Sequence, residues 1–395
     1  MNPIVLEKVD QAVAILQEKK IDLWLTFVRE TSVLADPMLA LIYGETGLTW
    51  HSALILTRQG QRVAIVGRLE REAAQATGAY TQVLTYDQSI QPVLLDTLEH
   101  LNPQQIAINT CPDDELADGL THGMYSLLTH MLASTPYHDR LISSAEVIAA
   151  LNGRKTAQEV QRIQTAVDIA EEIFASLFAE LRPGLTEREV AARMHAEVDR
   201  RGLETAWARA GCPAVNHGPL SAVGHGLPGD IPLEPGHILH LDFGVRYQGY
   251  CSDLQRVVYM LRPGETQPPE AVQHGFRTVA DTVQAVAQAM LPGTPGHELD
   301  QLARQRLTAA GYPEFPYGLG HQVGRRVHDG GALMGPLWER YGRRPLGTLE
   351  AGQVFTIEPG LMLPEHGYVG LEEDVIVTPQ GARFLSRPQT EWIVR

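Results

Sequence analysis

The twelve residues Leu233-Glu-Pro-Gly-His-Ile-Leu-His-Leu-Asp-Phe-Gly244 return, in altered form, as Leu349-Glu-Ala-Gly-Gln-Val-Phe-Thr-Ile-Glu-Pro-Gly360. Both copies begin with Leu-Glu-x-Gly, continue with an aliphatic residue and end in an aliphatic residue, an acid, any residue and glycine. A carboxylate therefore falls at the same point of each copy, Asp242 in the first and Glu358 in the second. Internal self-similarity of this kind indicates a repeated structural unit. We predict one domain of two related halves, each presenting a carboxylate at the end of a strand.

The first copy is followed by a predicted hairpin. The segment Tyr247-Gln-Gly249 favours a turn, and the β-rich run after it carries Asp253. A turn centred between Tyr247 and Gln248 would place Asp242 directly opposite Asp253, with Cβ atoms about 4.5–5.5 Å apart, where like charges are destabilising unless a cation lies between them. A register shifted by one residue would turn one of these acids to the other face. The sequence leaves both registers open.

A similar hairpin is expected after the second copy. Its turn is predicted around 364–367, and the returning strand, 368–378, carries the acids Glu372, Glu373 and Asp374. Alternation along a strand puts Glu372 and Asp374 on one face and Glu373 on the other. Carboxylates are seldom fully buried unless they are paired or bind something. The two hairpins are therefore predicted to surround one site.

One histidine completes this set of acids. His321 lies between glycines in Gly318-Leu-Gly-His-Gln-Val-Gly324, and glycines let the backbone approach closely. A single histidine in such a loop is more often structural than a metal ligand. With four carboxylates, however, it makes a ligand set able to hold two divalent ions about 3.5–4 Å apart, as in hydrolytic two-metal sites. His240, on the strand of the first copy, is expected to have a core or solvent-facing role instead.

Length and composition limit the class of protein. The chain has 395 residues, of which 44% are hydrophobic and 20% charged, so two globular domains are expected rather than a disordered chain. A formal net charge of -15 makes nucleic acid and anionic membranes poor partners. Three scattered cysteines predict neither a disulfide framework nor a thiolate zinc site. Because no export signal or membrane-spanning run is recognisable, we expect a cytoplasmic location.

The sequence pattern changes near residue 145. Before it, short β-rich segments such as Ser52 to Thr57 alternate with helical stretches, which is typical of an α/β layer. From Ala145 to Leu181 the periodicity becomes that of a long helix. We therefore predict an α/β domain over 1–145 and a mixed α/β (α+β) domain, containing the two related halves, over 146–395.

The motifs of the second domain resemble those of the pita-bread metallopeptidases, which include methionine aminopeptidase, aminopeptidase P and prolidase. The resemblance spans about residues 150 to 395. The preceding domain looks like the creatinase-type N-terminal domain of the prolidase and aminopeptidase P branch. The resemblance is carried, in chain order, by His225, Asp242-Phe-Gly, Ser-Asp253, Gly-Leu-Gly-His321, Val-His328-Asp, Thr-Ile-Glu358-Pro-Gly and Leu-Glu372-Glu-Asp.

This resemblance implies a metal site and a reaction. The implied ligands of two divalent ions per subunit, with Asp253 and Glu372 bridging, are Asp242, Asp253, His321, Glu358 and Glu372. Mn, Co, Zn and Fe all accept such ligands, so the metal is left open. The implied activity is hydrolysis of the Xaa-Pro bond of dipeptides or short peptides by a hydroxide that bridges the ions, with Glu358 as general base. His328 would donate to the substrate carbonyl, and His225 would contact the residue on the leaving side.

Two positions depart from the proline-specific branch of this family. Tyr317 stands where these enzymes commonly have histidine, and Gly370 stands where they commonly have arginine. Both positions are expected near the substrate, with Tyr317 among the substrate-binding residues. An arginine would bind a free C-terminal carboxylate strongly. The preference between dipeptides and longer peptides is therefore left open.

Three alternative functions accompany the leading one. An aminopeptidase P acting on longer peptides would use the same ligands. A creatinase-like hydrolase of C-N bonds would need no metal, but five ligand-type residues would then lack a partner. A non-catalytic peptide-binding relative would be expected to lack ligands, and none is missing. Because relatives with the N-terminal domain resemble homodimers, we also expect a homodimer in which Tyr43 to Trp50 limits access to the other subunit's site.

Overall fold

The computed structural model describes residues 3–224 and 226–395, which form two compact units, 1–152 and 153–395. The predicted boundary between residues 145 and 146 lies at the start of helix α6 (Ala145–Gly153). This helix belongs with the first unit because Val147, Ile148 and Leu151 are buried in that unit's core. The first unit therefore ends seven residues later than predicted.

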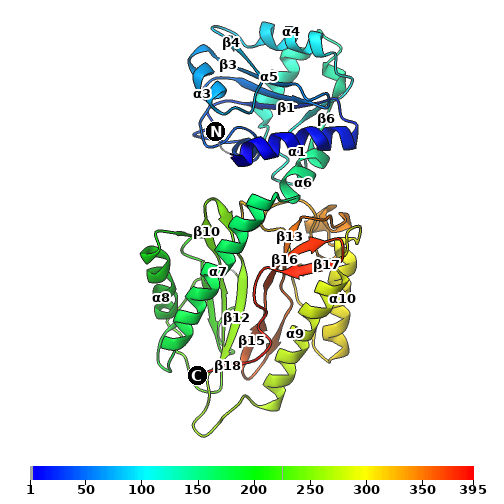
Figure 1. Ribbon diagram of the computed structural model, residues 1–395. Helices are drawn as coiled ribbons and strands as arrows, with labels where there is room; N and C mark the ends of the chain where they lie inside the picture. The colour runs from blue at the N-terminus through cyan, green and yellow to red at the C-terminus, as the bar shows by residue number, and fades with distance from the viewer. Residues whose placement is uncertain (1–2, 225) are drawn as a thin grey trace. The chain divides into compact units, whose positions relative to one another are not determined.

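The first unit is a six-stranded sheet with helices on both faces (Figure 1). The strand order is β4-β3-β2-β1-β5-β6, and β2 is antiparallel to both its neighbours while the other pairs are parallel. The strands are β1 Leu23–Val28, β2 Ser52–Thr57, β3 Arg62–Gly67, β4 Gln82–Tyr86, β5 Ile106–Ile108 and β6 Leu141–Ser143. The helices before α6 are α1 Pro3–Lys19, α2 Leu39–Ile42, η1 Arg68–Glu70, α3 Arg71–Ala76, α4 Gln91–Leu101, α5 His122–Leu132 and η2 His138–Arg140.

Strand β1 shows why this sheet has two covered faces. Leu23, Leu25 and Phe27 pack in one core with residues of α4 and α5, whereas Trp24 and Val28 pack in another with residues of α1 and α6. A strand buried on both faces is apolar along nearly its whole length, which explains why Thr26 is the one polar residue of β1.

The second unit contains two halves with the same order of elements, two helices followed by a hairpin (Figure 1). In the first half, α7 and α8 pack against strands β8, β10 and β11; in the second, α9 packs against β13, β14 and β17. The helices are α7 Ala157–Glu180, α8 Glu187–Arg200, α9 Glu270–Ala289, α10 Gly296–Ala309, η3 Glu339–Tyr341 and η4 Arg344–Leu346. The strands of the first half are β7 Glu204–Thr205, β8 Ala214–His217, β9 Ile238–Phe243, β10 Val245–Tyr247, β11 Tyr250–Cys251 and β12 Leu254–Tyr259. Those that follow are β13 Val354–Ile357, β14 Gly360–Leu363, β15 Gly367–Gly370, β16 Glu373–Thr378, β17 Gly381–Phe384 and β18 Ile393–Val394.

The first hairpin has a register that differs from the predicted one. Asp242 of β9 lies opposite Gln255 of β12, not opposite Asp253. The turn is centred on Gln248 and Gly249, whose φ angles of 47° and 82° are both positive, as a type I′ turn requires. The prediction placed the turn one residue too early, so the partner of Asp242 moved by two residues. A two-residue change preserves the face, and Asp242 and Asp253 still lie on the same side.

The second hairpin keeps one register on both sides of an interruption. Ile357 pairs with Glu373 in β13 and β16, and Gly360 pairs with Gly370 in β14 and β15. Pro359 cannot donate a backbone hydrogen bond, so the ladder is interrupted beside it. Glu358 and Glu372 lie in this interruption, between the two paired segments.

Across residues 3–224 and 226–395, none of the helices combines the length and the apolar character needed to cross a bilayer.

Candidate metal centre

Backbone hydrogen bonds bring three distant segments together. Gln255 and Glu372 each donate an N–H to the other's carbonyl at 3.3 Å, which joins the two hairpins. The loop that carries His321 lies beside β13, since Thr356 N–H donates to the His321 carbonyl at 2.9 Å. Glu358 N–H donates to the Leu319 carbonyl at 2.8 Å. The predicted ligands of the two halves therefore meet at one place.

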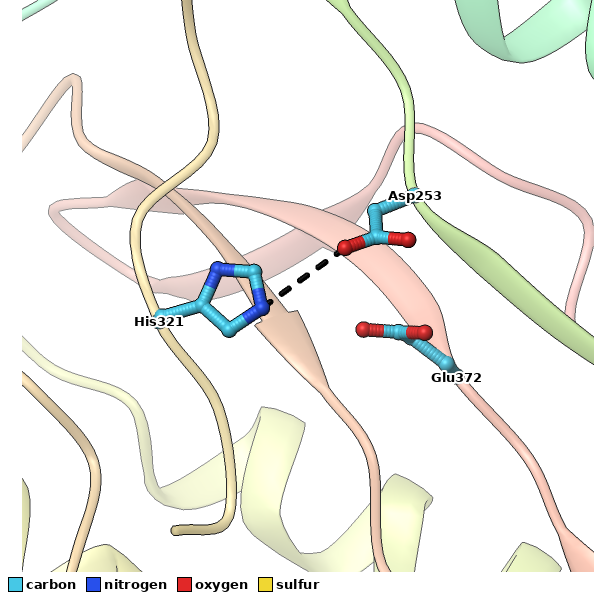
Figure 2. Close-up of side chains that lie close together, drawn as sticks. All are labelled: Asp253, His321 and Glu372. Carbon is cyan, nitrogen blue, oxygen red and sulfur yellow. Dashed lines mark ion pairs between the residues drawn. The ribbon is translucent and has the colours of Figure 1, made fainter. Parts of the chain in front are cut away.

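Asp253, His321 and Glu372 point toward one another (Figure 2). Each of these buried side chains offers a possible ligand atom within 4.8 Å of those of the other two. His321 Nε2 lies 3.6 Å from Asp253 Oδ2 and 3.5 Å from Glu358 Oε1. Asp242 lies next to them, because repulsion from the Asp242 carboxyl group contributes to the raised pKa of Asp253. All five predicted ligands are thus gathered at the junction of the two hairpins.

The carboxyl groups of this site are strongly perturbed. Burial raises the pKa of Asp242 to about 7. Burial also raises the pKa of Asp253, Glu358 and Glu372 well above the usual range, and repulsion from neighbouring acids adds to the shift. Burial lowers the pKa of His321 to about 3, so its ring is neutral, as a metal-binding imidazole must be.

The hydrogen bonding of the buried carboxylate oxygens indicates whether these residues can bind metal ions. At this site, four buried carboxylate oxygens have no hydrogen-bond partner among the described residues, namely Asp242 Oδ1, Asp253 Oδ1, Glu372 Oε1 and Asp374 Oδ1. Leaving a buried acceptor without a partner costs about 1–3 kcal/mol, and more when it is charged. Several such oxygens around one neutral imidazole are the donor set that divalent cations accept. The side chains gathered at this site are therefore suitable ligands for divalent metal ions.

The histidines and the tyrosine predicted near the substrate have different positions. The exposed ring of His328 meets the buried ring of His321 edge to face, with centroids 4.3 Å apart. Tyr317 is partly buried, and its hydroxyl forms a hydrogen bond with the hydroxyl of Tyr368. His225 lies outside the described residues.

The predicted alternation of the three acids at 372–374 is confirmed. It also explains the position of Asp374, which the ligand prediction omitted. Glu373 points away from the site and receives two hydrogen bonds from Arg256, at 3.1 and 3.0 Å. Asp374 Oδ2 accepts the backbone N–H of Asp253 at 3.0 Å. Asp374 therefore holds the backbone of the predicted ligand Asp253, and its position on the face of Glu372 was the available sequence signal.

Gln255 is a second residue of the site that sequence reasoning missed. Its Nε2 donates to Glu358 Oε2 at 3.3 Å. A glutamine two residues after Asp253 lies on the same strand face, but the contact with Glu358 joins the two halves of the domain. Only the packing of the hairpins could reveal it.

Comparisons with known proteins agree with this site. The chain matches metallopeptidase family M24 over residues 161–379. It is 31% identical over 251 residues to the Xaa-Pro dipeptidase of Pyrococcus furiosus, covering 62% of this chain and 66% of that protein. It is 26% identical over 350 residues to an uncharacterised peptidase of Bacillus subtilis, covering 88% of this chain and 92% of that protein.

Solved structures extend the likeness to nearly the whole chain. The prolidase from Pyrococcus horikoshii superposes with a TM-score of 0.70 at 25% identity, covering 98% of this chain and 100% of that one. The Xaa-Pro dipeptidase from Bacillus anthracis has a TM-score of 0.75 at 23% identity, covering 99% and 100%. The predicted pita-bread fold is confirmed. The family match spans more than half of the residues of this chain. The chain therefore belongs to metallopeptidase family M24 and is a peptidase.

Proposed function

We propose that this peptidase hydrolyses the Xaa-Pro bond of dipeptides and short peptides, using two divalent ions. The observation that carries the proposal is the group of buried carboxylates around His321, whose unpartnered oxygens need cations. The proline preference is supported by relatives that are named Xaa-Pro dipeptidase or prolidase. The ligands that we propose are Asp242, Asp253, His321, Glu358 and Glu372.

A second ion is supported by the central position of Asp253. One side of this carboxylate contacts Asp242, and Oδ2 lies 3.6 Å from His321 Nε2. A carboxylate between two other ligands can bridge two ions, and two-metal hydrolytic sites place their ions about 3.5–4 Å apart. Glu372 is the second proposed bridge. Mn, Co, Zn and Fe remain alternatives for the metal.

Different side chains of the protein would carry out different steps of the reaction. Bound divalent ions supply a water of lowered pKa and polarise the scissile carbonyl. Glu358 would accept a proton from the attacking water and return it to the nitrogen of the leaving proline. His328, exposed beside His321, would donate a hydrogen bond to the carbonyl oxygen as negative charge develops on it. The substrate contact of His225 stays a prediction from the sequence, as does a cytoplasmic location.

Aminopeptidase P activity on longer peptides is the main alternative, and the substrate end of the site gives it some support. Gly370 provides no cation there, and Tyr317 is bound to Tyr368 through its hydroxyl. Neither residue can form the bidentate contact with a free C-terminal carboxylate that an arginine would form. Discrimination against tripeptides should therefore be weak.

We expect dipeptides to be favoured over tripeptides by less than about tenfold in kcat/KM, because no strong carboxylate contact comes from these two positions. Substrates with alanine in place of proline should be cleaved at least about tenfold more slowly. A matched series of Xaa-Pro, Xaa-Pro-Yaa and Xaa-Ala peptides measures both ratios. Equal rates for Xaa-Ala and Xaa-Pro would contradict proline specificity, and complete inactivity on tripeptides would reveal a carboxylate-binding group elsewhere.

We further propose a homodimer that uses the first unit. Its exposed apolar side chains include Val33, Leu34, Trp50 and Leu69, which are 82%, 61%, 39% and 83% exposed. Their segments adjoin, since Glu70 accepts the backbone N–H of Trp50 and Thr31 N–H donates to the Leu48 carbonyl. Contiguous exposed apolar side chains mark interaction surfaces.

Sedimentation at assay concentration should show a dimer, and Leu69→Ser combined with Trp50→Ser should shift it toward monomer. The reason is that both substitutions remove apolar area from the proposed contact. An exposed substitution in the second unit, Leu291→Ser, is the matched control. A fully active wild-type monomer would refute the dimer.

A further inference from the structure

A chain of three buried side-chain contacts leads away from Glu358. Gln255 Nε2 donates to Glu358 Oε2 at 3.3 Å, while Gln255 Oε1 lies 2.9 Å from His240 Nε2. His240 Nδ1 in turn lies 3.2 Å from Asn216 Oδ1. Gln255, His240 and Asn216 are 6%, 4% and 5% exposed, so water does not compete for these contacts. This series of side-chain contacts crosses three neighbouring strands, β12, β9 and β8.

Further contacts hold the residues of this series in place. At the far end, Asn216 Nδ2 donates to the Ala222 carbonyl at 2.6 Å. The His240 ring is also held from the side, because it packs edge to face against Tyr368 with centroids 4.9 Å apart. A ring held by this aromatic neighbour presents its Nε2 in one direction. It therefore determines where the oxygen of the Gln255 amide points.

Gly370 provides the space for these contacts. A Cβ atom at this position would lie 2.5 Å from Gln255 Oε1 and 2.8 Å from His240 Nε2. Carbon and polar atoms cannot approach so closely without displacement. The absence of a side chain at 370, noted above as a departure from related enzymes, is thus the condition under which Gln255 and His240 can meet.

The direction of the hydrogen bonds follows from the chemistry of an amide. The NH₂ group of Gln255 can donate to Glu358 only while its carbonyl oxygen faces His240. Without the donor from His240, the amide would be free to rotate, and the contact with Glu358 would weaken. With it, Glu358 Oε2 is held, and Oε1 stays on the side of His321, 3.5 Å from Nε2.

We propose that Gln255 is a positioning residue for the Glu358 carboxylate, and that His240, which donates from Nε2 to the Gln255 oxygen, acts on Glu358 only through the orientation of the Gln255 amide. The proposal rests on the function proposed above for Glu358 as ligand and base. Residues that orient a metal ligand in this way typically contribute a factor of about 10–100 in metal affinity or activity.

The test begins with Gln255→Met, which keeps the length of the side chain and removes its donor. Metal-free protein is reloaded with Co²⁺, and kcat, KM and the visible Co²⁺ absorption spectrum are measured. We expect kcat to fall by about 10–100-fold, KM to stay within about twofold, and the Co²⁺ bands to change because Glu358 is reoriented. Gln353→Met is the matched control, since Gln353 is a glutamine of similar burial outside this chain of contacts. It should affect thermal stability alone.

His240→Phe and Gly370→Ala test the proposed order of action. Both should lower kcat by about 3–10-fold without touching Glu358 directly, and each remains informative if Gln255→Met fails to fold. Because His240 acts through Gln255, the double variant Gln255→Met/His240→Phe should be no slower than Gln255→Met. Multiplicative effects would overturn the proposal, as would a Gln255→Met variant whose kcat and Co²⁺ spectrum match the control. A wild type that binds Co²⁺ without cleaving Xaa-Pro would contradict the proposed substrate, while the Co²⁺ spectra would still decide the role of Gln255.

Discussion

Removal of divalent metal by a chelator abolishes peptide cleavage, and added Mn²⁺ or Co²⁺ restores it: this is the largest effect that we expect. The reason is that a metal-bound water is the proposed nucleophile, and uncatalysed peptide hydrolysis is slower by many orders of magnitude. Asp253→Ala and Glu372→Ala should each lower kcat/KM by about 10³-fold or more, because each removes a proposed bridging ligand. Metal analysis of the purified variants should show less metal per subunit than in the wild type.

The matched control for these substitutions is Asp230→Ala. Asp230 is an acid of the same unit whose side chain is 80% exposed and pairs with Arg188. It should keep wild-type metal content and activity. Full activity in exhaustively metal-free protein would contradict the two-metal proposal and would favour a metal-free hydrolase on this fold.

His328→Ala is expected to lower kcat by about 10²–10³-fold while the metal content stays at the wild-type level. The magnitude is that of removing one hydrogen-bond donor to a developing oxyanion. Retention of metal is expected because His328 is exposed and lies beside His321, whereas His321 faces Asp253 and Glu358. Stopped-assay kinetics combined with metal analysis measure the two properties on the same preparation.

The control for this substitution is His274→Ala, which removes an exposed histidine of α9 that contacts Tyr312. It should leave kcat unchanged. Loss of metal in His328→Ala would mean that the roles of His321 and His328 are reversed. Wild-type kcat in that variant would show that the carbonyl oxygen is stabilised by another donor.

The sequence alone determined the parts of this protein that follow from local pattern. The repeat at 233–244 and 349–360 indicated two related halves, because a carboxylate at the same point of two similar strands is a signal that needs no knowledge of packing. The family resemblance supplied the five proposed ligands by position. Alternation along the strand was also sufficient to separate Glu373 from Glu372 and Asp374, since side-chain direction in a strand depends only on parity.

The register of the first hairpin and the contacts between the two halves could not be predicted from local sequence pattern. The turn at Gln248 and Gly249 moved the partner of Asp242 by two residues, because turn geometry, and not the alternation of the strands, sets where a hairpin folds back.

Only the tertiary structure joined Gln255 to Glu358 and to His240. These contacts depend on the pairing of Gln255 with Glu372 across the two hairpins and on the absence of a side chain at Gly370. Whether a buried amide touches a ligand is decided by distances of a few tenths of an ångström between segments about a hundred residues apart in the chain. A linear pattern carries no information about such distances, so the chemistry of the acids could be predicted from the sequence, and the support that orients them could not.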